Sequence, residues 1–132
     1  MQYLKGTHNK GYILCPSEEK WLDCYVDTDF AGMWDTADSD DPSSVKSRTG
    51  YVIAFTNCPV LWVSKLQTEI ALSTMEAEYI ALSQAMHNII PMQTVLNEIA
   101  SITNLKIGRT IMHSMIFEDN MGCVELVKAP KM

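Results

Sequence analysis

The fold is decided by the stretch where the first strong helix signal begins, which reads Leu72-Ser73-Thr74-Met75-Glu76-Ala77-Glu78-Tyr79-Ile80-Ala81-Leu82. Ser73 followed three residues later by Glu76 is a capping pattern, and apolar residues then recur at helical spacing to about Ile90. We therefore predict that a helix begins here. Pro91 is expected to kink or restart it, and an amphipathic stripe continues beyond the proline to about Ser101.

The predicted helix carries one carboxylate on its apolar side. At about 100° per residue, Glu78 falls in the middle of an apolar stripe that spans about 40° to either side. The stripe is formed by Met75, Leu82, Ala85 and Ile89, together with Ala71 if that residue is helical. Glu76 points to roughly the opposite side and is interpreted as a residue of the first turn that the helix dipole favours. Glu78 is therefore predicted to face the rest of the fold, where a lone carboxylate is costly unless something positive compensates it.

Short β-type runs lie on both sides of this helix. Three precede it, over Trp21–Phe30, Tyr51–Thr56 and Val60–Lys65. Their spacing predicts an antiparallel meander. A mostly apolar run over Thr110–Phe117 follows the helix, and Asn120 is placed to cap a last helix over Met121–Lys128. We predict one α/β unit with a mixed sheet: three antiparallel strands, a crossover helix, a parallel strand and a helix.

The crossover predicts where acidic side chains meet. A helix between two strands of one sheet makes those strands parallel, so the strand that ends near Phe117 is expected to pair with the first strand. The carboxyl ends of both strands then lie on the edge where open α/β sheets place their ligands. Asp27 and Asp119 stand at these two ends, and Glu78 reaches the same edge from the helix. We therefore expect the three carboxylates to converge.

Such a convergence needs a compensating charge or proton. Three carboxylates within about 5 Å repel one another by roughly 3 kcal/mol per pair at an effective dielectric of 20. Either protons are taken up, or a hard divalent cation such as Mg²⁺ or Mn²⁺ lies among them. Spacing alone leaves two interpretations open: a metal site, and unrelated surface or capping acids.

Composition limits the class of protein. The chain has 132 residues, of which 47% are hydrophobic and 20% are charged, as in a globular domain. Its net charge of −6 repels nucleic acid, so the overall electrostatic field of the chain cannot account for binding to it. A nucleic-acid partner would have to be bound through a local group of residues or through a metal ion. The four cysteines and three histidines lack zinc-ligand spacing. No apolar stretch has the length of a membrane span or a signal core, so we expect an intracellular protein with no membrane partner.

Six motifs together resemble one known family. In chain order they are Tyr3-Leu4-Lys5-Gly6-Thr7, Tyr25-Val26-Asp27-Thr28-Asp29-Phe30-Ala31-Gly32, Ser47-Arg48-Thr49-Gly50-Tyr51, Ser64-Lys65-Leu66-Gln67, the stretch 72–82 quoted above, and Glu118-Asp119-Asn120. They are similar to the ribonuclease H domain of copia-type LTR retrotransposon Pol polyproteins, in that family's order and over nearly the whole chain. The resemblance implies a ribonuclease H-like fold over residues 20–132, with residues 1–19 as the tail of the reverse transcriptase connection.

The resemblance also implies an activity. Proteins of this family hydrolyse the RNA strand of RNA–DNA hybrids, and the implied mechanism uses two ions of Mg²⁺ or Mn²⁺. By motif, Asp27 matches the acid of the first strand, Glu78 the Glu-x-x-Ala helix position, and Asp119 the acid after the next strand. These three are implied to be the catalytic metal ligands. Asp29 and Glu118 flank them and are expected to be supporting or surface groups. The implied partners are an RNA–DNA hybrid and the reverse transcriptase portion of the same polyprotein.

Five residues are candidate contacts to nucleic acid. Thr28 and Asn120 are candidates for contacts to RNA 2′-hydroxyls near the site. Lys46, Arg48 and Lys65 are candidates for phosphate contacts, and the alternative that they are solvated surface charges stays open.

The chain departs from the family pattern at its C-terminal end. The family continues past the helix that follows the acid at Asp119 to further helices, another strand and a fourth metal-ligand acid. No residue here matches that acid by motif, so the ribonuclease H-like unit is expected to be incomplete at its C-terminus. This leaves two functions open: a hybrid ribonuclease within a Pol polyprotein, and an inactive transposon-derived fragment that binds nucleic acid or protein.

Overall fold

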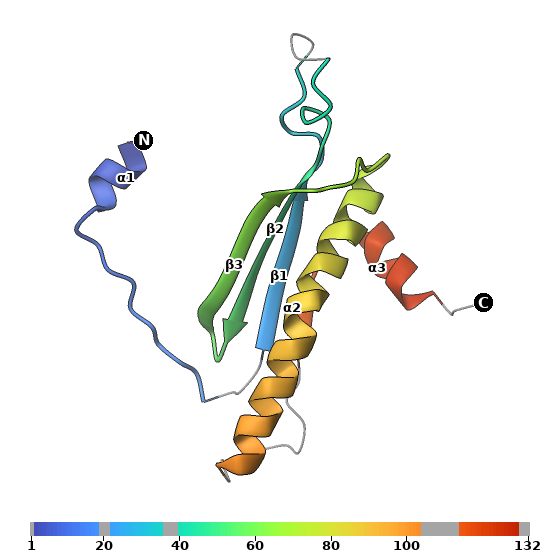
Figure 1. Cartoon of the computed structure of the whole chain (residues 1–132). Helices are drawn as coiled ribbons and strands as arrows, with labels where there is room; N and C mark the ends of the chain where they lie inside the picture. The colour runs from blue at the N-terminus through green and yellow to red at the C-terminus, as the bar shows by residue number, and fades with distance from the viewer. Residues whose placement is uncertain (1, 19–21, 36–39, 104–113, 130–132) are drawn as a thin grey trace.

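The computed structural model describes residues 2–18, 22–35, 40–103 and 114–129, which form a mixed α/β arrangement. In chain order the elements are α1 (Gln2–Thr7), β1 (Leu22–Asp29), β2 (Arg48–Phe55), β3 (Cys58–Leu66), α2 (Thr74–Ile102), β4 (Ser114–Phe117) and α3 (Met121–Lys128). The strands form one sheet in the order β3-β2-β1-β4. Figure 1 shows α2 lying along the sheet with α3 beside it, while α1 stands apart and buries no residue.

The sheet has the predicted pairing. Strand β2 is antiparallel to both β1 and β3, and β4 is parallel to β1. The hairpin between β2 and β3 turns at Thr56 and Asn57, whose φ angles of 51° and 66° are both positive, as in a type I′ turn. The antiparallel meander and the parallel crossover are therefore confirmed. The boundary expected at residues 19 and 20 and the first part of the strand expected over 110–117 lie outside the described residues.

Helix α2 begins as predicted but does not stop at its proline. The hydroxyl of Ser73 accepts a hydrogen bond from the backbone N–H of Glu76 at 3.1 Å, and the Glu76 carboxylate accepts one from the N–H of Leu72 at 2.7 Å. Of the kink or restart expected at Pro91, the restart is wrong, because α2 is one continuous helix. Pro91 has no backbone N–H, so the backbone carbonyl of His87 lacks its usual hydrogen-bond donor in the helix. Both residues are exposed, so water can hydrate this carbonyl.

The hydrophobic core lies between the sheet and the two C-terminal helices. It consists of Leu22, Cys24, Val26, Tyr51, Ile53, Ala81, Leu82, Ala85, Ile89 and Cys123. Ala77, Ala81 and Ala85 are fully buried, and their small side chains let α2 approach β1 closely. Within the described residues, no helix combines the length and apolar character that crossing a bilayer requires. The arrangement is consistent with a ribonuclease H-like fold.

The sheet also carries a row of exposed apolar side chains. Register places Trp62 opposite Val52, Val52 opposite Tyr25, and Tyr25 opposite Phe117. Their exposed fractions run from 38% at Val52 to 72% at Trp62. Inward and outward residues alternate along β1, as expected of a strand with one buried face. The row therefore marks the sheet face that points away from the core.

Candidate metal centre

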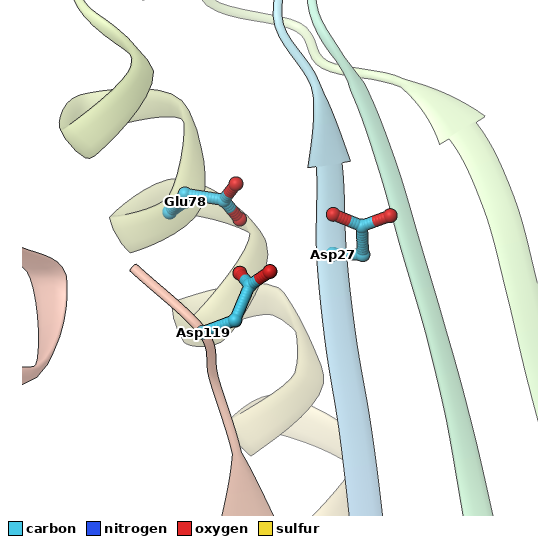
Figure 2. A group of neighbouring side chains, drawn as sticks. All are labelled: Asp27, Glu78 and Asp119. Atoms are coloured by element: carbon cyan, nitrogen blue, oxygen red, sulfur yellow. The ribbon is translucent and has the colours of Figure 1, made fainter. Parts of the chain in front are cut away.

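Three carboxylates from three elements meet at one place beside the sheet (Figure 2). Asp27 comes from the end of β1, Glu78 from the first turns of α2, and Asp119 from the segment between β4 and α3. One oxygen of each carboxylate lies within 4.8 Å of the others. Glu78 is buried, and the two aspartates are exposed. The expected convergence of these side chains is therefore observed, while their role as metal ligands remains a prediction.

The two aspartates also border a groove at the sheet edge. The groove has a volume of about 400 Å³ and is lined by Tyr25, Val26, Asp27, Ile116, Phe117, Glu118 and Asp119. It follows the parallel pair of β1 and β4 toward their carboxyl ends. This is the edge at which open α/β sheets place their ligands.

Glu78 is the most perturbed acid of the site. Its burial, together with the charges of Glu118, Asp27 and Asp119, raises the pKa of Glu78 to about 7 against an opposing hydrogen bond from Thr28. Its Oε2 atom is buried and has no hydrogen-bond partner among the described residues. A cation bound here would satisfy this oxygen and favour the ionised carboxylate.

Glu118 is a further carboxylate at the same edge. Its Oε1 atom accepts a hydrogen bond from the backbone N–H of Asn120 at 3.1 Å, and its Oε2 atom is buried without a partner in the described structure. Burial, with added repulsion from Asp119 and Asp27, raises the pKa of Glu118. Of the two expectations for Glu118, supporting group or surface group, its half-buried position favours the first.

The donor set fits a hard divalent cation. The three clustered side chains offer only carboxylate oxygens, which are the ligands that Mg²⁺ and Mn²⁺ prefer. The unpartnered, buried oxygen of Glu78 is a second and independent sign that a positive group belongs here. How many ions bind remains a prediction.

The basic candidates lie at the sheet end that carries Asp27. Arg48 begins β2, and Lys65 is next to the end of β3, so the antiparallel register brings both to the carboxyl end of β1. Lys65 is exposed, whereas Arg48 and Lys46 are half-buried. Phosphate contacts by these three residues remain a prediction.

The two small polar candidates each make a structural hydrogen bond. The Thr28 hydroxyl donates to the backbone carbonyl of Ala77 at 3.3 Å. The Asn120 side-chain oxygen accepts from the backbone N–H of Cys123 at 3.0 Å and so caps α3, as predicted. Contacts from Thr28 and Asn120 to 2′-hydroxyls remain a prediction.

Sequence reasoning missed the role of Gln67. This side chain is 1% exposed, and its Nε2 atom donates to Thr49 Oγ1 at 3.1 Å and to the Ala77 carbonyl at 2.9 Å. Gln67 follows directly after β3 in a segment without a hydrophobic period, so only its place in the Ser64–Gln67 motif pointed to it.

Similar sequences occur in transposon polyproteins. The retrovirus-related Pol polyprotein from transposon TNT 1-94 of Nicotiana tabacum is 38% identical over 100 residues, which are 75% of this chain and 7% of that protein. The corresponding polyprotein from transposon RE1 of Arabidopsis thaliana is 29% identical over 130 residues, which are 98% of this chain and 8% of that protein. The secreted RxLR effector protein 161 of Plasmopara viticola is 35% identical over 85 residues, which are 64% of this chain and 54% of that protein.

The other comparisons gave no match. No family model matches the chain. No solved structure matches it significantly.

The chain spans only 7% to 8% of the length of the Pol polyproteins named above. Its homologues include retrovirus-related Pol polyproteins of copia-type transposons, which indicates a retrotransposon-derived protein.

Proposed function

We propose that this chain is the ribonuclease H part of a retrotransposon Pol polyprotein and hydrolyses the RNA strand of RNA–DNA hybrids with the help of bound Mg²⁺ or Mn²⁺. The observation that carries the proposal is the convergence of Asp27, Glu78 and Asp119, one oxygen of each within 4.8 Å of the others. Similarity to Pol polyproteins supports the polyprotein context, in which the reverse transcriptase portion is the natural neighbour.

In this proposal the three carboxylates hold the cations, and none of them acts as the nucleophile. Asp27, near the end of β1, would be the candidate to contact both ions, and Glu78 and Asp119 would be the other carboxylate ligands. When bound, such ions activate a water molecule and stabilise the leaving oxygen of the phosphodiester. The exposure of Asp27 and Asp119 leaves this edge open to a phosphate group.

The proposal also accounts for the charge of the chain. A net charge of −6 repels nucleic acid, and the site itself is acidic. Binding of the hybrid should therefore require the cation, with Arg48, Lys46 and Lys65 as further contacts to phosphates on the same sheet end. Selection of RNA is assigned to contacts with 2′-hydroxyls, for which Thr28 and Asn120 are the candidates.

Cleavage of an end-labelled RNA–DNA hybrid in Mg²⁺ or Mn²⁺ tests the proposal. The comparison uses the wild-type chain, Asp27→Asn and Glu125→Gln, since Glu125 is an exposed acid of α3 outside the cluster. We expect wild type and Glu125→Gln to cut the RNA strand, and Asp27→Asn to be slower by on the order of 100-fold.

Two results would argue against the proposal. Equal cleavage by wild type and Asp27→Asn would remove the carboxylate site from the reaction. Binding of the hybrid without cleavage, both by this chain and by a longer Pol polyprotein that contains it, would favour the alternative of an inactive binding module.

A further inference from the structure

The backbone carbonyl of Ala77, in the turn that carries Glu78, is held by two side chains, one from β1 and one from the residue that follows β3. Nε2 of Gln67 donates a hydrogen bond to it at 2.9 Å, and the Thr28 hydroxyl donates another at 3.3 Å. The Ala77 carbonyl and the Glu78 N–H belong to one planar peptide group. These two hydrogen bonds therefore hold the peptide unit from which the Glu78 side chain projects.

Gln67 closes a ring of contacts around this point. Its Nε2 atom also donates to Thr49 Oγ1 at 3.1 Å, and Thr49 is the register partner of Thr28 across β1 and β2. The backbone N–H of Gln67 donates to the carbonyl of Ser47 at 2.8 Å, which anchors the residue next to the start of β2. One buried amide thus connects the sheet end that carries Asp27 to the turn of α2 that carries Glu78.

The chemistry of the ring fixes the orientation of the Gln67 amide. A peptide carbonyl only accepts hydrogen bonds, so the NH₂ group must face Ala77. The Oε1 atom then lies buried without a partner in the described structure. An apolar side chain of similar size leaves no unpaired oxygen at such a position, so packing alone does not explain an amide here. What the amide adds is the pair of donated hydrogen bonds.

We propose that Gln67 is a positioning residue for Glu78: it holds the Ala77–Glu78 peptide against β2 and thereby sets where the Glu78 carboxylate lies relative to Asp27 and Asp119. Gln67 acts through the backbone of α2 and not as a metal ligand. This inference rests on the proposed metal site. It implies that the affinity of the site for a divalent cation depends on a side chain that belongs to none of the three ligand-bearing elements.

The test measures two quantities on the full chain. Titration calorimetry with Mn²⁺ gives the metal affinity, and urea unfolding in EDTA gives the stability of the metal-free fold. The variants are Gln67→Met, which keeps the size of the side chain and removes both donors, and Gln84→Met as the matched control. Gln84 lies on α2 outside the ring, and its Oε1 atom is likewise buried without a partner among the described residues.

We expect Gln67→Met to weaken Mn²⁺ binding by on the order of 10-fold, as for other groups that orient metal ligands. Gln84→Met should bind Mn²⁺ like wild type, and both variants should unfold cooperatively in EDTA. If Gln67→Met does not fold, Thr49→Val and Thr49→Ser repeat the test at Thr49 Oγ1, which accepts the other hydrogen bond of the Gln67 amide. Thr49→Ser keeps the accepting hydroxyl and should retain the affinity that Thr49→Val loses.

The outcomes distinguish a failure of the positioning role from a failure of the proposed function. Equal Mn²⁺ affinity of wild type and Gln67→Met would overturn the positioning role and leave the metal site intact. A loss that Gln84→Met reproduces would also overturn it, because the effect would belong to α2 in general. Failure of the wild-type chain to bind Mn²⁺ would overturn the proposed function and the inference with it.

Discussion

Tyr25 and Phe117 are register partners across β1 and β4, and their rings stack with centroids 4.8 Å apart and planes inclined by 10°. Each lies two residues before an aspartate of the candidate metal centre, Asp27 or Asp119. Asp27 continues β1 beyond Tyr25, whereas Asp119 lies two residues past the end of β4, so the pairing of the two rings fixes the point from which the chain leaves the sheet toward Asp119. The stacked pair therefore stabilises the register on which the convergence depends.

Loss of this stacking should weaken both the sheet and the site. We expect Phe117→Leu to lower the free energy of unfolding by about 1 kcal/mol, the size of a cross-strand aromatic pair, and to weaken Mn²⁺ binding. Urea unfolding and Mn²⁺ titration measure the two effects. Trp62→Leu is the control, since Trp62 lies in the same exposed row but on β3, away from β4. An equal loss of Mn²⁺ affinity in Trp62→Leu would mean that the stacked pair has no special role.

The close approach of α2 to β1 should not tolerate a larger side chain. Ala81 is fully buried at this contact, so Ala81→Leu is expected to lower the free energy of unfolding by about 1–3 kcal/mol through overpacking. Ser83→Leu, at an exposed position of the same helix, should change it by no more than about 0.5 kcal/mol. Urea unfolding of both variants checks the difference, and an unchanged midpoint for Ala81→Leu would contradict the close packing.

The raised pKa of Glu78 predicts a pH dependence of the metal-free fold. The pKa is about 7 in the folded chain against an ordinary value of 4.5, so the folded state holds this proton more tightly. The resulting stabilisation is present below about pH 4.5 and is lost as the pH rises through about 7. In EDTA, the free energy of unfolding should therefore fall between these pH values more steeply in wild type than in Glu78→Gln, whose amide does not titrate. Urea unfolding at a series of pH values compares the two, and parallel curves would contradict the raised pKa.

Local chemistry in the sequence was enough to predict the part of the fold that carries the site. The capping residues Ser73 and Glu76 gave the start of α2, and helical periodicity gave the inward direction of Glu78. The handedness and direction rules for crossovers then gave the parallel pairing of β4 with β1. These features depend on short-range patterns and on general topology, which a single sequence contains.

Other features depend on packing that no local pattern records. Pro91 predicts an interruption from its own covalent structure, but its exposed position lets the helix continue. Strand β2 begins at Arg48, before the predicted start at Tyr51, because its polar first residues pair through the backbone with both neighbouring strands. The burial of Gln67 likewise follows from its contacts with β2 and α2, which are distant in sequence.

The most direct measurement of the central claim is a calorimetric titration of the full chain with Mn²⁺, carried out on wild type, Asp27→Asn and Glu125→Gln. If Asp27, Glu78 and Asp119 form a metal site, wild type and Glu125→Gln will bind Mn²⁺ saturably with the same affinity, and Asp27→Asn will bind at least about 10-fold more weakly. Equal binding by all three proteins, or no saturable binding by wild type, would contradict the account.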